Sequence, residues 1–184
     1  MTCFRKGLVA GVAALAGAVV LTAMPAQAAP PRHTPSLQAQ LRQVQDILAI
    51  QQLLGDYTVE IDAKDWPAYA ALFADDGELI FSSARAKGPA AIAEVMARTP
   101  PPSASGRAPP EMRHLCTNLV IHVDGDHGTA HSRWTGLTTD ADGKIKVGGA
   151  GRYEDQLVRQ HGQWKFLRRV VYGDFPSRDP LAPK

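Results

Sequence analysis

Two side chains able to move protons stand where the sequence predicts one helix to end and one strand to begin. Asp62 follows a long run of apolar residues at helical spacing, and a carboxylate in the last turn of a helix opposes the helix dipole. His114 opens an apolar-rich run that ends at Val123. Positioned imidazole and carboxylate groups are common general acids and bases. Local reasoning leaves a plainer alternative open for each: a solvated loop carboxylate, and a histidine on the solvent-facing side of its strand.

Tyr57 is a third candidate, because a phenol hydroxyl can donate a hydrogen bond to a substrate oxygen. It lies five residues before Asp62, which places the two side chains about 140° apart on an ideal helix. Both therefore reach one pocket only if the helix ends or bends between them. The alternative is that Tyr57 is a core or rim residue.

Other kinds of site are weakly represented in the sequence. His122, His127 and His131 straddle a predicted hairpin without a carboxylate at metal-ligand spacing, so we expect no metal site. The sequence has no motif for a phosphate, a dinucleotide or a serine nucleophile, and no cofactor is expected. Cys116 is expected to be a small buried thiol.

Helices are predicted in the first half of the chain. The periodicity predicts a long helix over residues 37–61 capped by Ser36, or two helices with a break near Gly55. Asp65 is expected to cap a second, short helix. The remaining elements of this half are expected to be a turn at 75–77, a strand at 78–82 and a helix at 88–98.

A meander of long strands is predicted in the second half. Turns that contain Asp-Gly or His-Gly separate the segments, which is typical of hairpins. The strands are expected at residues 112–123, 129–139, 144–160 and 163–174. Gly148, Gly149 and Gly151 predict a bulge or a sharp bend in the third strand. Plain alternation in the first strand puts Leu115 on its more apolar face and His114 on its more polar face.

Helices followed by long antiparallel strands predict an α+β fold, with the helices packed on one sheet face. A bent sheet over helices encloses a cone, which is a pocket wherever the core side chains do not fill it. The proline-rich residues 99–110 are expected to form a loop, either a pocket lid or a surface loop. Arg168 and Arg169 are expected on a solvated edge, where one of them pairs with Asp155 or Glu154.

Composition and the N-terminus indicate one exported globular domain. The 184 residues are 45% hydrophobic and 21% charged. Residues 1–28 are predicted to be a secretory signal, because Arg5 and Lys6 are followed by an apolar run at 7–23 and by a cleavage site with two small residues. The alternative is a membrane anchor that is retained. Without Arg5 and Lys6, 18 of the 20 basic residues remain against 18 acidic ones, so neither nucleic acid nor an acidic membrane is an expected partner. We expect a secreted or periplasmic protein.

Four stretches of the sequence resemble the SnoaL-like branch of the nuclear-transport-factor-2-like superfamily. They are Tyr57-x-x-x-Ile61-Asp62-x-x-Asp65-Trp66, Arg113-His114-x-x-x-Asn118, Gly151-x-Tyr153-x-Asp155 and Gly162-x-Trp164-x-Phe166-x-x-Arg169. The resemblance implies a cone-shaped barrel of about three N-terminal helices packed on a strongly curved, mostly antiparallel sheet. It also implies a homodimer formed through the outer sheet face, and a covered second face that lets His114 face a pocket.

Within this superfamily, the segment around Asp62 is similar to the one that carries the catalytic aspartate of scytalone dehydratase. The spacing of Tyr57 and Asp62, together with His114, is also similar to that of bacterial bile-acid dehydratases. The resemblance therefore implies catalytic roles for these three residues. The residues predicted to line the substrate site are Asn118, Trp134, Phe81 and Tyr153.

The expected organisation is a signal peptide at 1–28, a flexible tether at 29–36, a SnoaL-like domain at 37–176 and a C-terminal tail at 177–184. The expected function is that of a cofactor-independent, dehydratase-like lyase or isomerase. It would act on a small apolar hydroxylated or carbonyl compound by His–Asp acid–base catalysis. The alternative, which the sequence leaves open, is a non-catalytic module that uses the same cone to bind a small ligand or to dimerise.

Overall fold

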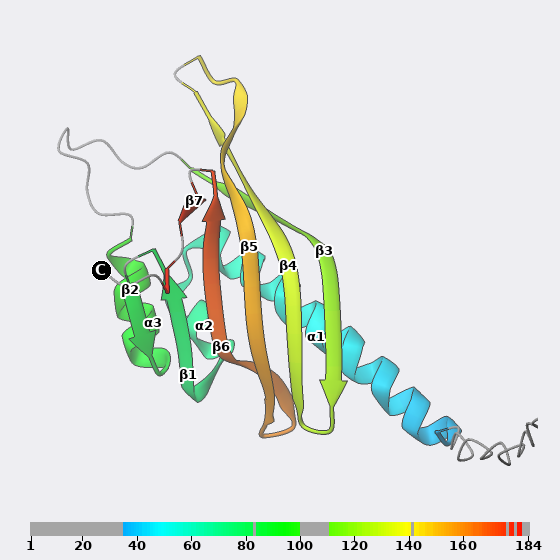
Figure 1. Ribbon diagram of the computed structural model, residues 1–184. Coiled ribbons are helices and arrows are strands. Elements are labelled where there is room, and N and C mark those ends of the chain that lie inside the picture. The colour runs from blue at the N-terminus through cyan, green and yellow to red at the C-terminus, as the bar shows by residue number, and fades with distance from the viewer. Residues whose placement is uncertain are drawn as a thin grey trace, which may run out of the picture. The chain divides into compact units, whose positions relative to one another are not determined.

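The computed structural model describes residues 35–82, 84–99, 111–140, 142–175, 177–178 and 180–181 (Figure 1). The predicted signal peptide, most of the tether and nearly all of the proline-rich loop lie outside these residues. The helices are α1 (Leu37–Ala63), α2 (Trp66–Ala71) and α3 (Pro89–Ala97). The strands are β1 (Phe73–Phe81), β2 (Ala84–Lys87), β3 (Arg113–Asp124), β4 (His127–Thr139), β5 (Ile145–Gln160), β6 (Gln163–Asp174) and β7 (Ser177–Arg178).

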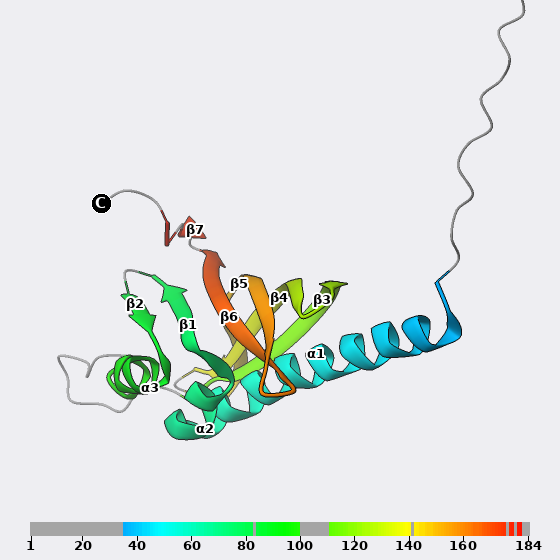
Figure 2. The same cartoon turned by 90° about the horizontal axis from the view of Figure 1, so that it is seen from below.

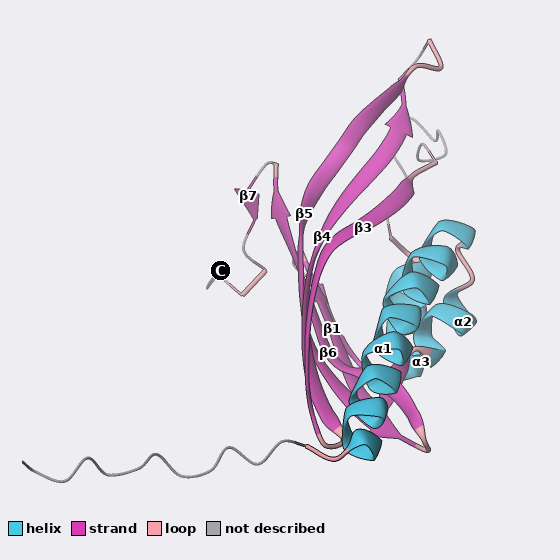
Figure 3. Ribbon diagram, turned by 90° about the vertical axis from the view of Figure 1, so that its right-hand side faces the viewer, coloured by secondary structure: helices cyan, strands magenta, loops and turns pink. Residues whose placement is uncertain are grey.

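The strands form one mixed sheet in the order β2-β1-β6-β5-β4-β3, and β7 pairs with β6. All neighbouring strands are antiparallel except β1 and β6, which are parallel. The sheet bends over the three helices, which lie on one of its faces (Figure 3). The predicted α+β fold with helices on one face is confirmed. The strands do not close into a barrel, because β2 and β3 remain as two open edges.

The long helix is continuous through Gly55, so the alternative of two helices is wrong. Ser36 caps its start by accepting a hydrogen bond from the backbone of Ala39. It ends at Lys64, whose φ of 59° lies in the left-handed region that stops a helix. Asp65 then caps α2 through the backbone of Ala68, as predicted. This tight junction fixes the direction in which the last turn of α1 presents its side chains.

The apolar stripe of α1 is divided between core and solvent. The buried members lie in its second half: Ile50, Leu53, Leu54 and Tyr57. The exposed members lie mainly in its first half: Leu37, Leu41, Val44 and Leu48. Figures 1 and 2 show the reason, since the first turns of α1 run out past the edge strand β3. Within the described residues, no helix has the length and apolarity needed to cross a membrane.

The turn expected at residues 75–77 is wrong, because these residues lie within β1. The strand is irregular there, and its register against β6 shifts between Phe73 and Glu78. At Gly77 the backbones come so close that an added Cβ would lie 2.7 Å from the carbonyl oxygen of Phe166. Two short strands, β2 and β7, were not predicted, since segments of four and two residues carry too little pattern.

Besides the irregularity in β1, the described strands contain three β-bulges. In β3 the register shifts between Thr117 and Val120, and Asn118 takes a φ of 54°. Between β4 and β5 the register shifts at Gly148, which is an extra residue of β5 between the partners of Gly136 and Leu137. This confirms the bulge predicted from the glycines. Between β5 and β6 the shift inserts Leu167 as an extra residue.

The bulge in β3 reverses the face on which the prediction placed His114. His114 and Cys116 are half-buried on the helix side, whereas Leu115 is exposed. Beyond the bulge the inward positions are Ile121 and Val123, which have the opposite parity. Plain alternation from the apolar end of the strand therefore assigned His114 to the wrong face. Cys116 is only partly buried, against the edge of the core.

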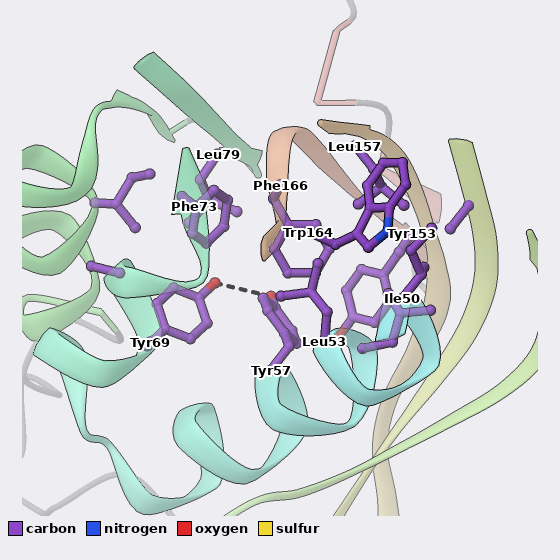
Figure 4. Packing of buried hydrophobic residues seen from close by; sticks show 14 of the residues in the cluster. Ile50, Leu53, Tyr57, Tyr69, Phe73, Leu79, Tyr153, Leu157, Trp164 and Phe166 are labelled. Carbon is purple, nitrogen blue, oxygen red and sulfur yellow. Dashed lines mark hydrogen bonds between the residues drawn. The ribbon is translucent and has the colours of Figure 1, made fainter. Parts of the chain in front are cut away.

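Aromatic side chains fill the space between the helices and the sheet (Figure 4). Tyr57 from α1 lies at their centre, with its ring 4.9 Å from that of Tyr69, 5.4 Å from Tyr153 and 5.8 Å from Phe166 between centroids. Such tilted and edge-on pairs are favourable arrangements for buried rings. The lower part of the cone is thus solid core, and any hollow must lie above it.

Candidate functional site

Asp62 and His114 meet at the point where α1 ends beside β3. Asp62 Oδ1 lies 2.6 Å from His114 Nδ1, and Asp62 Oδ2 accepts a hydrogen bond of 2.9 Å from the His114 backbone N–H. The side chains are 18% and 14% exposed, respectively. One carboxylate therefore holds both the ring and the backbone of the histidine. The contact becomes charge-assisted whenever the imidazole takes up a proton.

The carboxylate also determines which ring nitrogen is free to act. Since a carboxylate only accepts hydrogen bonds, the neutral imidazole must carry its proton on Nδ1. This leaves Nε2 with a lone pair. Among the described residues, none makes a hydrogen bond to Nε2 of His114. The pair is thus arranged as a base and the group that orients it.

A cavity of about 230 Å³ lies above the aromatic core, and His114 forms part of its wall. Its other lining residues come from all three helices, several strands and the residues on either side of 100–110: Tyr57, Ile61, Tyr69, Leu79, Phe81, Met96, Thr99, Met112, Trp134, Gly148, Gly149, Tyr153 and Val171. Most of these side chains are apolar. The imidazole and the tyrosine hydroxyls are therefore the groups that could orient a polar atom of a ligand.

Tyr57 and Asp62 approach the site in different ways, although they share a helix. Tyr57 lines the cavity itself, whereas Asp62 acts from behind His114. The helix therefore does not need to bend between them. Tyr69 donates a hydrogen bond of 3.0 Å to the Tyr57 hydroxyl, so the proton of Tyr57 is not used in this contact (Figure 4). Burial raises the pKa of Tyr57, so this hydroxyl remains a neutral donor.

Arg169 is a functional candidate that the sequence analysis missed. It is fully buried rather than on a solvated edge. Alternation from Phe166 would point Arg168 inward, but the extra residue Leu167 turns Arg169 inward instead. The predicted pairing with Asp155 is confirmed, with two hydrogen bonds of 2.7 Å.

The Arg169 guanidinium places a cation beside the tyrosines of the cavity. Its central carbon lies 3.9 Å from the Tyr57 ring centroid and 4.2 Å from that of Tyr153. Burial alone would lower the pKa of Arg169, but the charge and hydrogen bonds of Asp155 outweigh it and hold that pKa above its ordinary value. The side chain therefore stays charged. Its field favours negative charge near the Tyr57 hydroxyl.

The predicted lining residues divide into three inside and one outside. Phe81, Trp134 and Tyr153 line the cavity. Asn118 does not, because it occupies the bulge of β3 and is exposed. Its left-handed φ explains why asparagine suits this position without any contact to a ligand.

Trp134 is fixed across the sheet by a single hydrogen bond. Its indole Nε1 donates to the backbone oxygen of Tyr172 at 3.0 Å, which carries the ring over Gly151. A Cβ at Gly151 would lie 1.9 Å from that oxygen and 2.7 Å from Nε1. Only glycine allows this contact, so one of the glycines predicted to bend β5 also positions a wall of the cavity.

The described residues contain no group of three or more histidine, cysteine, aspartate or glutamate side chains close enough to hold a metal ion. His122 and His131 lie on β3 and β4, and His127 begins β4 after the turn.

Comparison with known proteins connects this arrangement to a family. The sequence model of the family described as the SnoaL-like domain matches residues 42–170 of this chain. A search of curated proteins gave no match. Among solved structures, the Mycobacterium tuberculosis protein Rv3472, of unknown function, is 32% identical, with a TM-score of 0.63 over 73% of this chain and 75% of that chain.

Two structures from Novosphingobium aromaticivorans are also similar. One is a nuclear-transport-factor-2-like protein with a cystatin-like fold, 26% identical, with a TM-score of 0.64 over 73% of this chain and 86% of that chain. The other is a candidate scytalone dehydratase, 20% identical, with a TM-score of 0.60 over 79% of this chain and 93% of that chain. At the latter identity, the likeness concerns the fold alone.

Proposed function

The chain belongs to the SnoaL-like domain family, and from this premise we propose that it is a lyase or isomerase that works without a cofactor. Its substrate is a small, mostly apolar compound with a carbonyl and, for elimination, a hydroxyl group on the second carbon from it. The observation that carries the proposal is the double hold of Asp62 on His114, at the wall of a largely apolar cavity.

In the proposed reaction, His114 first acts as the base. Nε2 takes the proton from the carbon next to the carbonyl, and the electron pair moves onto the carbonyl oxygen to form an enolate. The imidazolium is stabilised by Asp62 at 2.6 Å. The enolate oxygen accepts a hydrogen bond from Tyr57, and the buried Arg169 beside that ring favours the negative charge.

His114 then acts as the acid. The enolate re-forms the carbonyl, a carbon–carbon double bond forms, and the carbon–oxygen bond to the hydroxyl group breaks. The imidazolium gives its proton to the departing hydroxyl, which leaves as water. For isomerisation, the same proton returns to a different carbon. Proton transfer by one positioned group of this kind contributes about 10²–10⁴ in rate.

The test uses the purified domain with hydroxylated bicyclic and polycyclic ketones, with loss of water followed by mass spectrometry. Wild-type protein is expected to dehydrate at least one of them, whereas His114→Gln is expected to lose at least 100-fold in rate. His122→Gln is the matched control, because His122 lies on the same strand and is exposed. Turnover by His114→Gln within twofold of wild type would reject the proposal, and binding of these ketones without turnover by wild type would favour the non-catalytic module.

A further inference from the structure

Met112 forms the wall of the cavity beside His114. It lies two residues before His114 in the chain, and both side chains line the cavity. The thioether of Met112 lies over two glycines of the neighbouring strands, Gly136 on β4 and Gly148 on β5. A Cβ added at Gly136 would lie 2.6 Å from Sδ of Met112, and one added at Gly148 would lie 3.3 Å from its Cε. Met112 therefore takes up space that side chains at these two positions would otherwise need.

Gly136 allows Met112 to lie flat against the sheet. In the pairing of β3 with β4, Gly136 lies directly opposite His114. It is buried, and the described residues that line the cavity do not include it, since the side chain of Met112 lies over it. The φ of Gly136 is outside the left-handed region, so the backbone itself does not require glycine there. The three atoms nearest to an added Cβ all belong to Met112, so the missing side chain at Gly136 serves the position of the thioether.

The size of the cavity depends on the side chain at position 112. Met112 is half-buried, and an unbranched thioether side chain adapts readily to the space around it. At about 230 Å³ the cavity is smaller than the roughly 300–1,000 Å³ of most small-molecule sites. A shorter side chain at this position would leave the space over the two glycines empty and add it to the cavity. Displacement of Met112 away from the sheet would instead narrow the cavity beside His114.

We infer that Met112 is a residue that determines which size of ligand fits beside His114. Wild-type protein takes a compact bicyclic ligand, and the thioether excludes a further ring on the side of the imidazole. The selection is steric, because the part of Met112 that lies over the glycines is apolar. This inference rests on the proposed function, since that function makes the cavity the substrate site. It adds a residue that selects ligands without taking part in proton transfer.

The experiment compares the binding of two ketones by isothermal titration: 1-tetralone, which has two fused rings, and tetrahydrophenanthrenone, which has three. Wild-type protein is expected to bind 1-tetralone at least tenfold more tightly. Met112→Ala should shift the ratio of the two affinities at least tenfold towards the larger ketone. The larger ketone gains apolar contacts in the opened space, while 1-tetralone loses its contact with the thioether. Met112→Val, which keeps more of the wall, should give a smaller shift in the same direction.

Gly136→Ala tests the same inference in the opposite direction. The added methyl group would lie 2.6 Å from Sδ of Met112, so it displaces the thioether away from the sheet and into the cavity. We therefore expect 1-tetralone to bind at least fivefold more weakly than to wild type. In the Met112→Ala background, the same substitution should change this affinity less than twofold. Gly55→Ala is the matched control, since an added Cβ there has no neighbour within 4 Å, and it should leave both affinities unchanged.

Melting temperatures identify the variants that fold, and Met112→Val takes the place of Met112→Ala if the latter does not. Titration of His114→Gln with and without Met112→Ala separates this inference from the proposed function, because the shift in the affinity ratio should persist there whether or not wild type has activity. Three results would overturn the inference: an unchanged ratio in the folded Met112 variant, equal losses from Gly136→Ala in both backgrounds, or no binding of either ketone to wild type and the variants.

Discussion

Replacing Asp62 by Asn removes the charge behind His114 while keeping the shape of the side chain. The carboxylate accepts from both Nδ1 and the backbone N–H. An amide has only one accepting oxygen, so one of these two donors loses its partner. The variant is therefore expected to hold the imidazole less firmly and to stabilise its protonated form less.

The size of the effect follows from the geometry. Two unit charges about 4 Å apart attract each other by about 4 kcal/mol at an effective dielectric constant of about 20. Because both side chains are 14–18% exposed, we expect about 3 kcal/mol to act on the transition state. This corresponds to a loss of about 100-fold in kcat. KM should change little, since Asp62 contacts the histidine rather than the cavity.

The assay is steady-state dehydration of the best ketone, with Asp62→Asn, His114→Gln and the double variant compared. If Asp62 acts only through His114, the double variant should be no slower than His114→Gln alone. Multiplicative losses in the double variant, or a kcat for Asp62→Asn within twofold of wild type, would refute the idea that the carboxylate works through the imidazole.

Three further predictions concern stability and assembly. Although burial opposes it, hydrogen bonds from Arg159 and Trp164 hold the pKa of Asp46 below its ordinary value. The contribution of ionised Asp46 to the free energy of unfolding is therefore complete above the unfolded-state pKa of about 4, and it is lost as the pH falls through the lower folded-state pKa. The melting temperature of Asp46→Asn should consequently depend less on pH in this range than that of wild type. Arg169→Met should lower the free energy of unfolding by about 3–5 kcal/mol, and adding Asp155→Leu should recover most of it; urea denaturation would contradict this if the double variant were no more stable. The homodimer stays a prediction: sedimentation should show a dimer that Leu115→Lys, on the sheet face turned away from the helices, converts to monomer.

The elements with strong periodicity or punctuation could be predicted from the sequence. Ser36 and Asp65 cap their helices as expected, and the Asp-Gly and His-Gly turns separate β3 to β6. Two errors share a cause, since His114 and Arg169 each lie on a strand whose parity is changed by a bulge. A bulge is one extra residue stabilised by partners elsewhere in the sheet, and local alternation does not reveal it.

The contact between Asp62 and His114 could be predicted only because the family resemblance supplied geometry that the local sequence lacks. Asp62 and His114 are separated by 52 positions, and neither shows locally that it will meet the other. Arg169 had one available signal, an acidic residue at Asp155 on the neighbouring strand, but no local feature indicated that the pair is buried. Asn118 belongs to the family-like stretch that begins at Arg113 and was predicted to line the substrate site, but it is exposed in the bulge of β3 with a left-handed backbone.

The bulge at Asn118 makes the site depend on a count of residues as well as on their identity. Three steps along β3 from Thr117 to Val120 match two steps along β4, from Arg133 to His131. Shortening β3 by one residue here would restore even pairing and rotate everything before it by half a turn. The imidazole of His114 would then point into bulk water, although every residue that lines the cavity would still be present in the sequence. The length of β3 at this one position is therefore as necessary for the contact between Asp62 and His114 as the two residues themselves.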